Sequence, residues 1–151
     1  MLQRIQTVYL LLVTVCAVVC LCMPVGHFHQ DGICVADFYN LWLAPVNGAH
    51  DFTPWAMFVL LLFAAVSSFA AVFLYKRRMF QARLSVFGGL LLLGYYIVLA
   101  VFVYLFRSRL SADFTISWTA AFPAVAMILE YLAFRGIMKD ELIVRSLDRL
   151  R

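Results

Sequence analysis

The sequence predicts an all-α membrane protein, a four-transmembrane-helix bundle with both termini cytoplasmic and an amphipathic cytoplasmic C-terminal helix. Three observations support this fold class. Hydrophobic residues make up 66% of the 151 residues and charged residues only 13%, against about 45–50% and about 25% in soluble domains. Four apolar stretches reach the roughly 20 residues that a helix needs to cross a bilayer. Ten of the 12 Lys and Arg residues fall on one side of these stretches.

The four stretches belong to a single integral membrane domain that takes up the whole chain. They cover residues 5–25, 54–75, 84–106 and 116–134. The run Val-Leu-Leu-Leu-Phe inside the second stretch does not alternate apolar with polar residues, as the strands of a membrane barrel would. Helices are therefore the structure that satisfies the backbone hydrogen bonds in lipid. Pro123 lies inside the fourth stretch, where a bend is expected.

The distribution of Lys and Arg predicts the orientation in the membrane. Arg4 precedes the first stretch, four basic residues lie between the second and third, and five follow the fourth. The loop 26–53 has no Lys or Arg, and Arg107 and Arg109 are the two basic residues between the third and fourth stretches. We therefore expect a multi-pass membrane protein with both termini cytoplasmic and the loop 26–53 on the outer side. The net charge of +4 follows from this asymmetry and does not indicate nucleic acid as a partner.

The loop 26–53 is too apolar to lie free in water, since it contains Phe28, Phe38 and Trp42 among other apolar residues. We expect it to fold back over the outer ends of the helices, with a short helix or a pair of strands. Its polar residues raise the question of a metal site.

Imidazole and thiol groups gather in the same loop as His27, His29, His50 and Cys34. Together they could bind zinc or copper. The paired ligand spacings typical of zinc sites are absent. Solvated loop residues are therefore the favoured interpretation, and a metal site is the alternative.

Glu130 is the acidic residue inside the fourth stretch, and the other three stretches contain none. A charged side chain at the membrane centre costs about 2.5–3.5 kcal/mol or more. Glu130 lies four residues before Phe134, close to the predicted inner end. We expect it to meet water or to pair with Arg83 or Arg135. The alternative is a proton or cation site.

The cytoplasmic tail 135–151 has the pattern of an amphipathic helix. Arg145 and Arg149 fall on one side, and at 100° per residue the apolar residues gather on the other. This helix can continue the fourth stretch. Either the anionic inner leaflet or a protein partner would suit its two faces.

Three segments carry a resemblance to a known family. They are residues 3–10 (QRIQTVYL), residues 74–84 with Leu-Tyr-Lys-Arg-Arg at their start, and residues 139–151 with Lys-Asp-Glu and Asp-Arg-Leu-Arg. Together they resemble a family of small four-helix inner-membrane proteins from Bacteroidota, catalogued as a domain of unknown function. The resemblance implies a bacterial source and the inner (cytoplasmic) membrane as the compartment, which makes 26–53 a periplasmic loop, but it implies no activity, substrate or cofactor. All three segments lie on the side predicted to be cytoplasmic.

The leading hypothesis for function is a non-enzymatic accessory or scaffold subunit. No catalytic set, nucleotide-binding loop or zinc-protease pattern occurs, and no cofactor is expected. The basic cytoplasmic face would bind a protein partner or the membrane surface. Its candidate interaction residues are Lys76, Arg77, Arg78, Arg83, Arg145, Asp148, Arg149 and Arg151. Two alternatives stay open: a subunit of a small-molecule or ion transporter using Glu130, and a periplasmic metal or redox protein.

Overall fold

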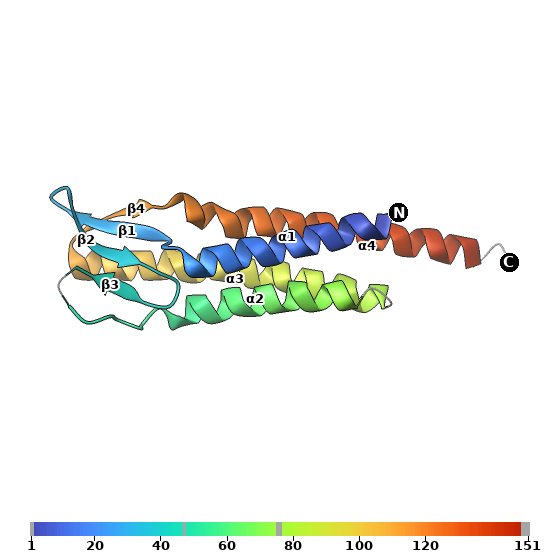
Figure 1. Cartoon of the computed structure of the whole chain (residues 1–151), viewed down its shortest axis with the longest axis horizontal. Coiled ribbons are helices and arrows are strands. Elements are labelled where there is room, and N and C mark those ends of the chain that lie inside the picture. Colours follow the sequence, from blue (N-terminus) through green and yellow to red (C-terminus); the bar gives the residue numbers. More distant parts are fainter. Residues whose placement is uncertain (1, 47, 75–76, 149–151) are drawn as a thin grey trace.

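Four helices form an elongated bundle in the computed structural model, which describes residues 2–46, 48–74 and 77–148. They are α1 (Leu2–Cys22), α2 (Trp55–Phe73), α3 (Arg78–Leu110) and α4 (Phe122–Asp148). Both α1 and α3 pack against α2 and α4, which closes the bundle (Figure 1). By length and composition, four helical segments can cross a membrane, as predicted. The structure thus agrees with a membrane protein.

All four helices differ from their predicted bounds, and the third and fourth differ most. At 1.5 Å per residue α3 is about 50 Å long, well beyond the roughly 30 Å of a hydrocarbon core. The fourth stretch does not begin at Ile116, because Trp118–Ala121 forms a 3₁₀ helix (η1) and α4 starts at Phe122. Pro123 is therefore the second residue of α4, where a missing N–H breaks no helical hydrogen bond. The predicted bend at Pro123 is wrong.

The all-α fold class is wrong at one end of the molecule, which carries a four-stranded antiparallel sheet. In sheet order the strands are β3 (Leu43–Pro45), β2 (Ile33–Phe38), β1 (Gly26–Gln30) and β4 (Asp113–Ile116). Three strands come from the predicted periplasmic loop and β4 comes from the connection between α3 and α4. We call this the sheet end; the two termini lie at the other end of the bundle (Figure 1).

The hairpin of β1 and β2 follows from its local sequence. Asp31 and Gly32 form the turn and have φ values of 53° and 79°. Two consecutive positive φ values characterise the tight turn that matches the twist of a hairpin, and Asp-Gly is a preferred pair for it. Of the two options predicted for the loop, the pair of strands is the correct one.

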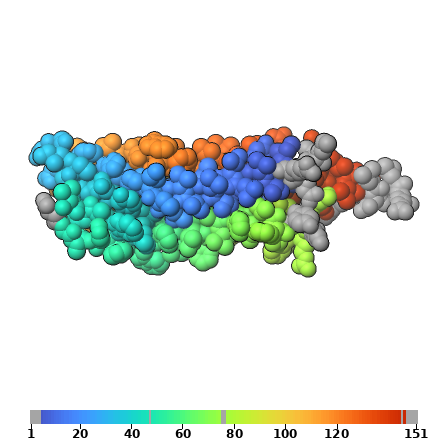
Figure 2. Space-filling model, in the orientation of Figure 1, coloured from blue at the N-terminus to red at the C-terminus, as the bar shows by residue number. Residues whose placement is uncertain are grey.

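An aromatic core attaches the sheet to the end of α3. The rings of Phe28, Phe38, Phe106 and Phe114 lie with centroids 5.1 to 6.3 Å apart. Gly26 makes room for this packing, because a Cβ there would lie 2.3 Å from the ring of Phe114. In the space-filling view the strands continue the surface of α1 and α2 without a break (Figure 2). The sheet is thus part of the same packed body as the bundle.

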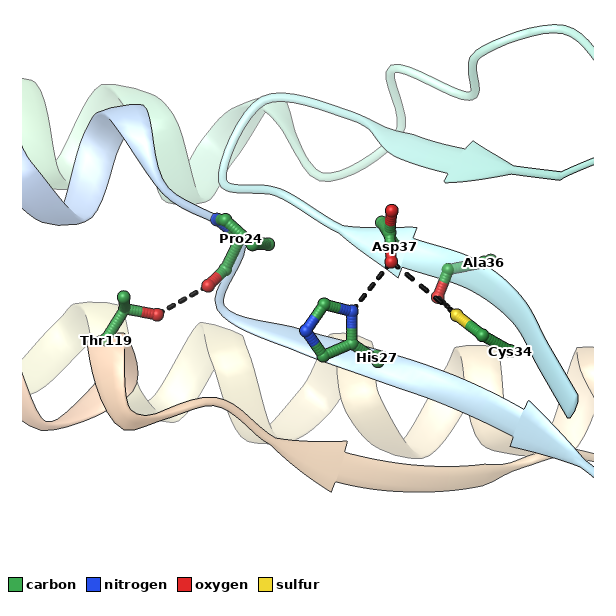
Figure 3. A network of polar contacts seen from close by, with 6 residues as sticks. All are labelled: Pro24, His27, Cys34, Ala36, Asp37 and Thr119. Atoms are coloured by element: carbon green, nitrogen blue, oxygen red, sulfur yellow. Dashed lines mark hydrogen bonds and ion pairs between the residues drawn. The ribbon is translucent and has the colours of Figure 1, made fainter. Parts of the chain in front are cut away.

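A buried polar network also ties the sheet end to the helices. Asn40 is fully buried; its Nδ2 donates to the carbonyl of Cys20 at 2.6 Å, and its Oδ1 accepts from the Tyr95 hydroxyl at 2.8 Å. The Thr119 hydroxyl donates to the carbonyl of Pro24 (Figure 3). These bonds join the end of α1, the β2–β3 connection, α3 and η1.

Candidate functional site

The exposed face of the sheet brings together an imidazole, a thiol and a carboxylate. His27 on β1 lies opposite Asp37 on β2, and its Nδ1 is 2.7 Å from Asp37 Oδ1. The Cys34 thiol donates to the same oxygen over 3.6 Å (Figure 3). One ligand atom from each residue lies within 4.8 Å of the other two. We call His27, Cys34 and Asp37 the His–Cys–Asp cluster.

A β-bulge places Cys34 in this cluster. Phe28 pairs with Ala36, but the next residue of β1, His29, pairs with Cys34, so that Val35 is an extra residue on β2. A bulge re-aims the side chains that follow it. Strict alternation would have put Cys34 on the face opposite Asp37. The bulge therefore places the thiol beside the carboxylate.

The cluster is open to solvent, and its surroundings raise the pKa of its thiol. The side chains of His27 and Asp37 are 35% and 44% exposed. Desolvation, and after it the negative charge of Asp37, raise the pKa of the Cys34 thiol. An ion arriving from outside can thus reach all three groups, and a cation would offset the charge that opposes ionisation of the thiol.

The structure assembles only part of the predicted metal-ligand set. His27 and Cys34 meet, whereas the His50 ring packs near that of Trp42, with centroids 6.0 Å apart. The His29 ring lies 6.4 Å from that of His27, and its buried Nδ1 has no hydrogen bond within the described residues. Asp37 was missed as a candidate. The Asp-Gly turn alone could not have found it, because the register that the turn sets would pair His27 with Ala36, and the bulge at Val35 shifts this partner to Asp37.

Glu130 forms a second polar site, deep between α2, α3 and α4. Its side chain is only 2% exposed, and its Oε1 accepts a hydrogen bond from the Ser68 hydroxyl. Gly88 leaves the space for it, because a Cβ there would lie 2.6 Å from Oε1. The Ser85 hydroxyl lies near the carboxyl group, but within the described chain neither it nor Glu130 Oε2 forms a hydrogen bond of normal length and angle.

The predicted partners of Glu130 do not reach it. Arg83 and Arg135 are exposed, and neither forms an ion pair with Glu130 in the part of the chain that the structure describes. Instead, Glu130 and Ser85 line an apolar groove of about 320 Å³ between α3 and α4. The carboxyl group is thus held by the Ser68 hydroxyl rather than by a cation.

The basic residues gather at the end of the bundle opposite the sheet, which we call the basic end. Arg77, Arg78 and Arg83, together with Glu141 and Val144 of α4, line a groove of about 610 Å³. Of the other predicted interaction residues, Lys76, Arg149 and Arg151 lie outside the described residues. Arg145 and Asp148 are described only by their place in α4. The structure therefore brings three of the eight candidates together.

The tail is a direct continuation of α4, as its pattern allowed. As far as Asp140 it packs against α1: Ile137 is 1% exposed, and Gln6 Nε2 donates to Asp140 Oδ2 at 2.6 Å. Gly136 permits this approach, because a Cβ there would lie 3.2 Å from Gln6 Cγ. Beyond this contact α4 projects along the axis of the bundle, and Leu142 is 64% exposed (Figure 1).

The comparison with protein families agrees with the predicted resemblance. The model of a family described as a domain of unknown function (DUF4293) matches residues 2–150, so the chain belongs to this family. No curated protein matches the chain. The family name carries no activity, and the function has to be argued from the three sites above.

Proposed function

We propose that this DUF4293 protein is a non-enzymatic subunit of a complex in the inner membrane of a Bacteroidota cell. In this proposal both termini are cytoplasmic, and the basic end binds an acidic segment of a protein partner. The uneven distribution of Lys and Arg supports the orientation, because basic residues favour the cytoplasmic side.

The observation that carries the proposal is the course of α4 past the other helices (Figure 1). A helix that continues along the bundle axis leaves the membrane instead of lying in its surface, as an interfacial helix does. Its projecting turns expose Leu142 and Ile143, which are 64% and 44% exposed. Apolar side chains on a water-exposed helix favour docking on a protein, as amphipathic recognition helices do.

The groove beside α4 adds a charge preference to this surface. Among the described residues no ion pair involves the side chains of Arg77, Arg78 or Arg83. The groove thus presents three guanidinium groups on one side, and Val144 with the single carboxylate of Glu141 on the other. Guanidinium groups bind carboxylates in a bidentate fashion. A partner segment with carboxylates beside apolar residues would therefore pair with the guanidinium groups and pack on Val144.

Site-specific photo-crosslinking in the native membrane tests the proposal. A photoreactive residue replaces Leu142 in the full-length chain, and a matched one replaces Ile33, which is 71% exposed at the sheet end. We expect a discrete protein adduct from position 142 and not the same adduct from position 33. Arg77→Glu with Arg78→Glu should reduce the adduct several-fold, because like charges then face the partner. The control is Arg107→Glu with Arg109→Glu, which should leave it unchanged. Adducts with lipid alone, or a protein adduct that is indifferent to Arg77 and Arg78, contradict the proposal.

A second candidate function uses Glu130. The unpartnered Oε2 beside the Ser85 hydroxyl favours it, since buried polar groups in membrane helices mark ion or proton paths. In that case the chain is a subunit of an ion or small-molecule transporter. Glu130→Gln should abolish a proton- or cation-coupled flux in proteoliposomes, whereas Glu141→Gln on the same helix should not. An unchanged flux in Glu130→Gln removes this role.

A further inference from the structure

We propose that the exposed face of the sheet binds a late transition-metal ion of the Zn²⁺ class through His27 Nδ1, Cys34 Sγ and a carboxylate oxygen of Asp37. The site lies at the sheet end, on the opposite side of the membrane from the surface proposed above. It is independent of that function.

The ligand atoms of the His–Cys–Asp cluster all lie within 4.8 Å of one another, so a tetrahedral ion can bind with small side-chain movements. Zn–N and Zn–O distances of about 2.0–2.2 Å and a Zn–S distance of about 2.3 Å place neighbouring ligand atoms roughly 3.3–3.7 Å apart. The Cys34 Sγ to Asp37 Oδ1 distance is already 3.6 Å. The His27 to Asp37 distance of 2.7 Å opens by roughly 0.6–0.7 Å when the ion replaces the hydrogen bond.

The chemistry of the three ligands selects the class of ion. Imidazole and thiolate favour Zn²⁺ and its neighbours, whereas Mg²⁺ and Ca²⁺ require oxygen ligands throughout. Three protein ligands leave the fourth position of a tetrahedral ion to water. On binding, the Cys34 thiol releases its proton to solvent, and His27 carries its remaining proton on Nε2. No other bond changes, and the ion bridges β1 and β2.

The arginine side chains of the sheet end do not pair with the Asp37 carboxylate, so this carboxylate can bind a cation. The two Arg side chains of the sheet end already pair elsewhere, Arg107 with Asp113 at 2.9 Å and Arg109 with Asp51 at 3.1 Å. The loop that forms β1 to β3 contains no Lys or Arg. A divalent ion would therefore enter a site without a competing positive charge.

The β-bulge is the second feature that supports a built site. It disrupts the ladder between β1 and β2 at Val35 and places the thiol beside Asp37. Bulges recur where a strand has to re-aim a functional side chain. A hairpin needed only to cover the aromatic core could keep regular pairing throughout.

Titration of the full-length protein in detergent with Co²⁺ tests the proposal, because thiolate-bound tetrahedral Co²⁺ has characteristic absorption bands. We expect one equivalent to bind with a thiolate-to-cobalt charge-transfer band, and Zn²⁺ to displace it. His27→Gln, Cys34→Ser and Asp37→Asn should each weaken binding about tenfold or more, and Cys34→Ser should also remove the charge-transfer band. The matched controls are Cys22→Ser and His50→Gln, at the same end of the bundle but outside the cluster, and both should bind like the parent protein.

Two results with the Cys34→Ser and control variants would overturn the metal site. One is a Co²⁺ spectrum that persists unchanged in Cys34→Ser. The other is binding that the two control variants weaken as much as the cluster variants do. Circular dichroism of each variant without metal separates lost ligands from lost folding. Asp37→Asn keeps a hydrogen-bonding side chain beside His27, so a folded Asp37→Asn variant with parental affinity also counts against the site.

Discussion

The two ends of the bundle bury polar side chains in opposite ways. At the sheet end Asn40 is fully buried, and both ends of its amide have partners, the Cys20 carbonyl and the Tyr95 hydroxyl. Towards the basic end Glu130 is almost as buried, but among the described residues only its Oε1 accepts a hydrogen bond. A satisfied network rigidifies a core, whereas a half-satisfied one costs free energy. The comparison assigns Asn40 to structure and marks Glu130 as a residue kept for another reason.

The forces that pack the two ends also differ. The aromatic core around Phe28 shields apolar surface from water, so the hydrophobic effect holds the sheet on α3. In the proposed membrane setting the helices around Glu130 face lipid, where apolar burial between helices gains little and close contact of small residues matters more. Gly88 and Ser67 provide such a contact, since a Cβ at Gly88 would lie 3.3 Å from Ser67 Oγ. Substitutions of equal size should therefore change the free energy of unfolding by different amounts at the two ends.

The largest expected effect comes from truncating an aromatic ring at each end. Phe28→Ala should lower the free energy of unfolding by about 3–5 kcal/mol, because it removes a fully buried ring from the sheet core. The same change at Phe80, which is 54% exposed at the basic end, should cost about 0.5 kcal/mol or less. Equilibrium unfolding in detergent measures both. Equal losses would show that the aromatic core does not hold the sheet.

The next contrast compares the two buried polar residues themselves. Asn40→Ala should cost about 2–3 kcal/mol, because the Cys20 carbonyl and the Tyr95 hydroxyl lose their partner. Glu130→Gln should leave stability unchanged within about 0.5 kcal/mol: the amide oxygen still accepts from Ser68, and the amide nitrogen gains a donor role. Thermal unfolding of both variants in one detergent decides the matter. A Glu130→Gln variant as unstable as Asn40→Ala would make the carboxylate structural.

The helices were predictable because lipid leaves the backbone few choices, while the sheet depended on contacts between distant segments. Each apolar stretch satisfies its own hydrogen bonds as a helix, so composition alone locates it. β4 has only four residues, and its partner β1 lies about 85 residues away along the chain. Local sequence does not predict a pairing between strands so far apart along the chain. The hairpin was the exception, because Asp31-Gly32 carries a turn signal of its own.

Single residues of the sites could be predicted from the sequence, but their partners could not. Glu130 was identifiable because a carboxylate in an apolar stretch is costly wherever it points. Its partner Ser68 lies on another helix, and helix rotation decides which side chains meet. His27 and Cys34 were found by residue type, whereas Asp37 joins them through the hairpin register and the bulge. Side-chain chemistry can be read from a sequence, but its juxtaposition requires the fold.

Two adjacent glycines sharpen the comparison within α3. Gly88→Ala should cost about 1–2 kcal/mol, because its Cβ would meet Glu130 Oε1 at 2.6 Å and the neighbouring helix would have to shift. Nothing lies within 4 Å of a Cβ at Gly89. Gly89→Ala should therefore raise the free energy of unfolding by at most about 1 kcal/mol, because alanine has a higher helix propensity than glycine. Unfolding by a denaturing detergent compares the two variants directly. A loss in both would mean that α3 needs glycine for its backbone rather than for the approach of Glu130.

The smallest effect concerns Asp51, at the edge of the sheet end. Its Oδ1 accepts hydrogen bonds from the hydroxyl and the backbone N–H of Thr53, and these lower the pKa of the carboxyl group. A lowered pKa stabilises the fold above the unfolded-state value of about 3.9, and that stability is lost as the pH falls through the folded-state pKa. Asp51 is 32% exposed and its pair with Arg109 faces solvent, so the gain is only about 0.5 kcal/mol.

Asp51→Asn should therefore be less stable than the parent protein by that amount at pH 7, and equally stable once the pH is well below 4. Thermal unfolding of both proteins across this range measures the difference. Thr53→Val removes the hydroxyl donor, so the effect of Asp51→Asn should shrink in that background. A difference that stays constant with pH would place the role of Asp51 in the shape of the turn rather than in its charge.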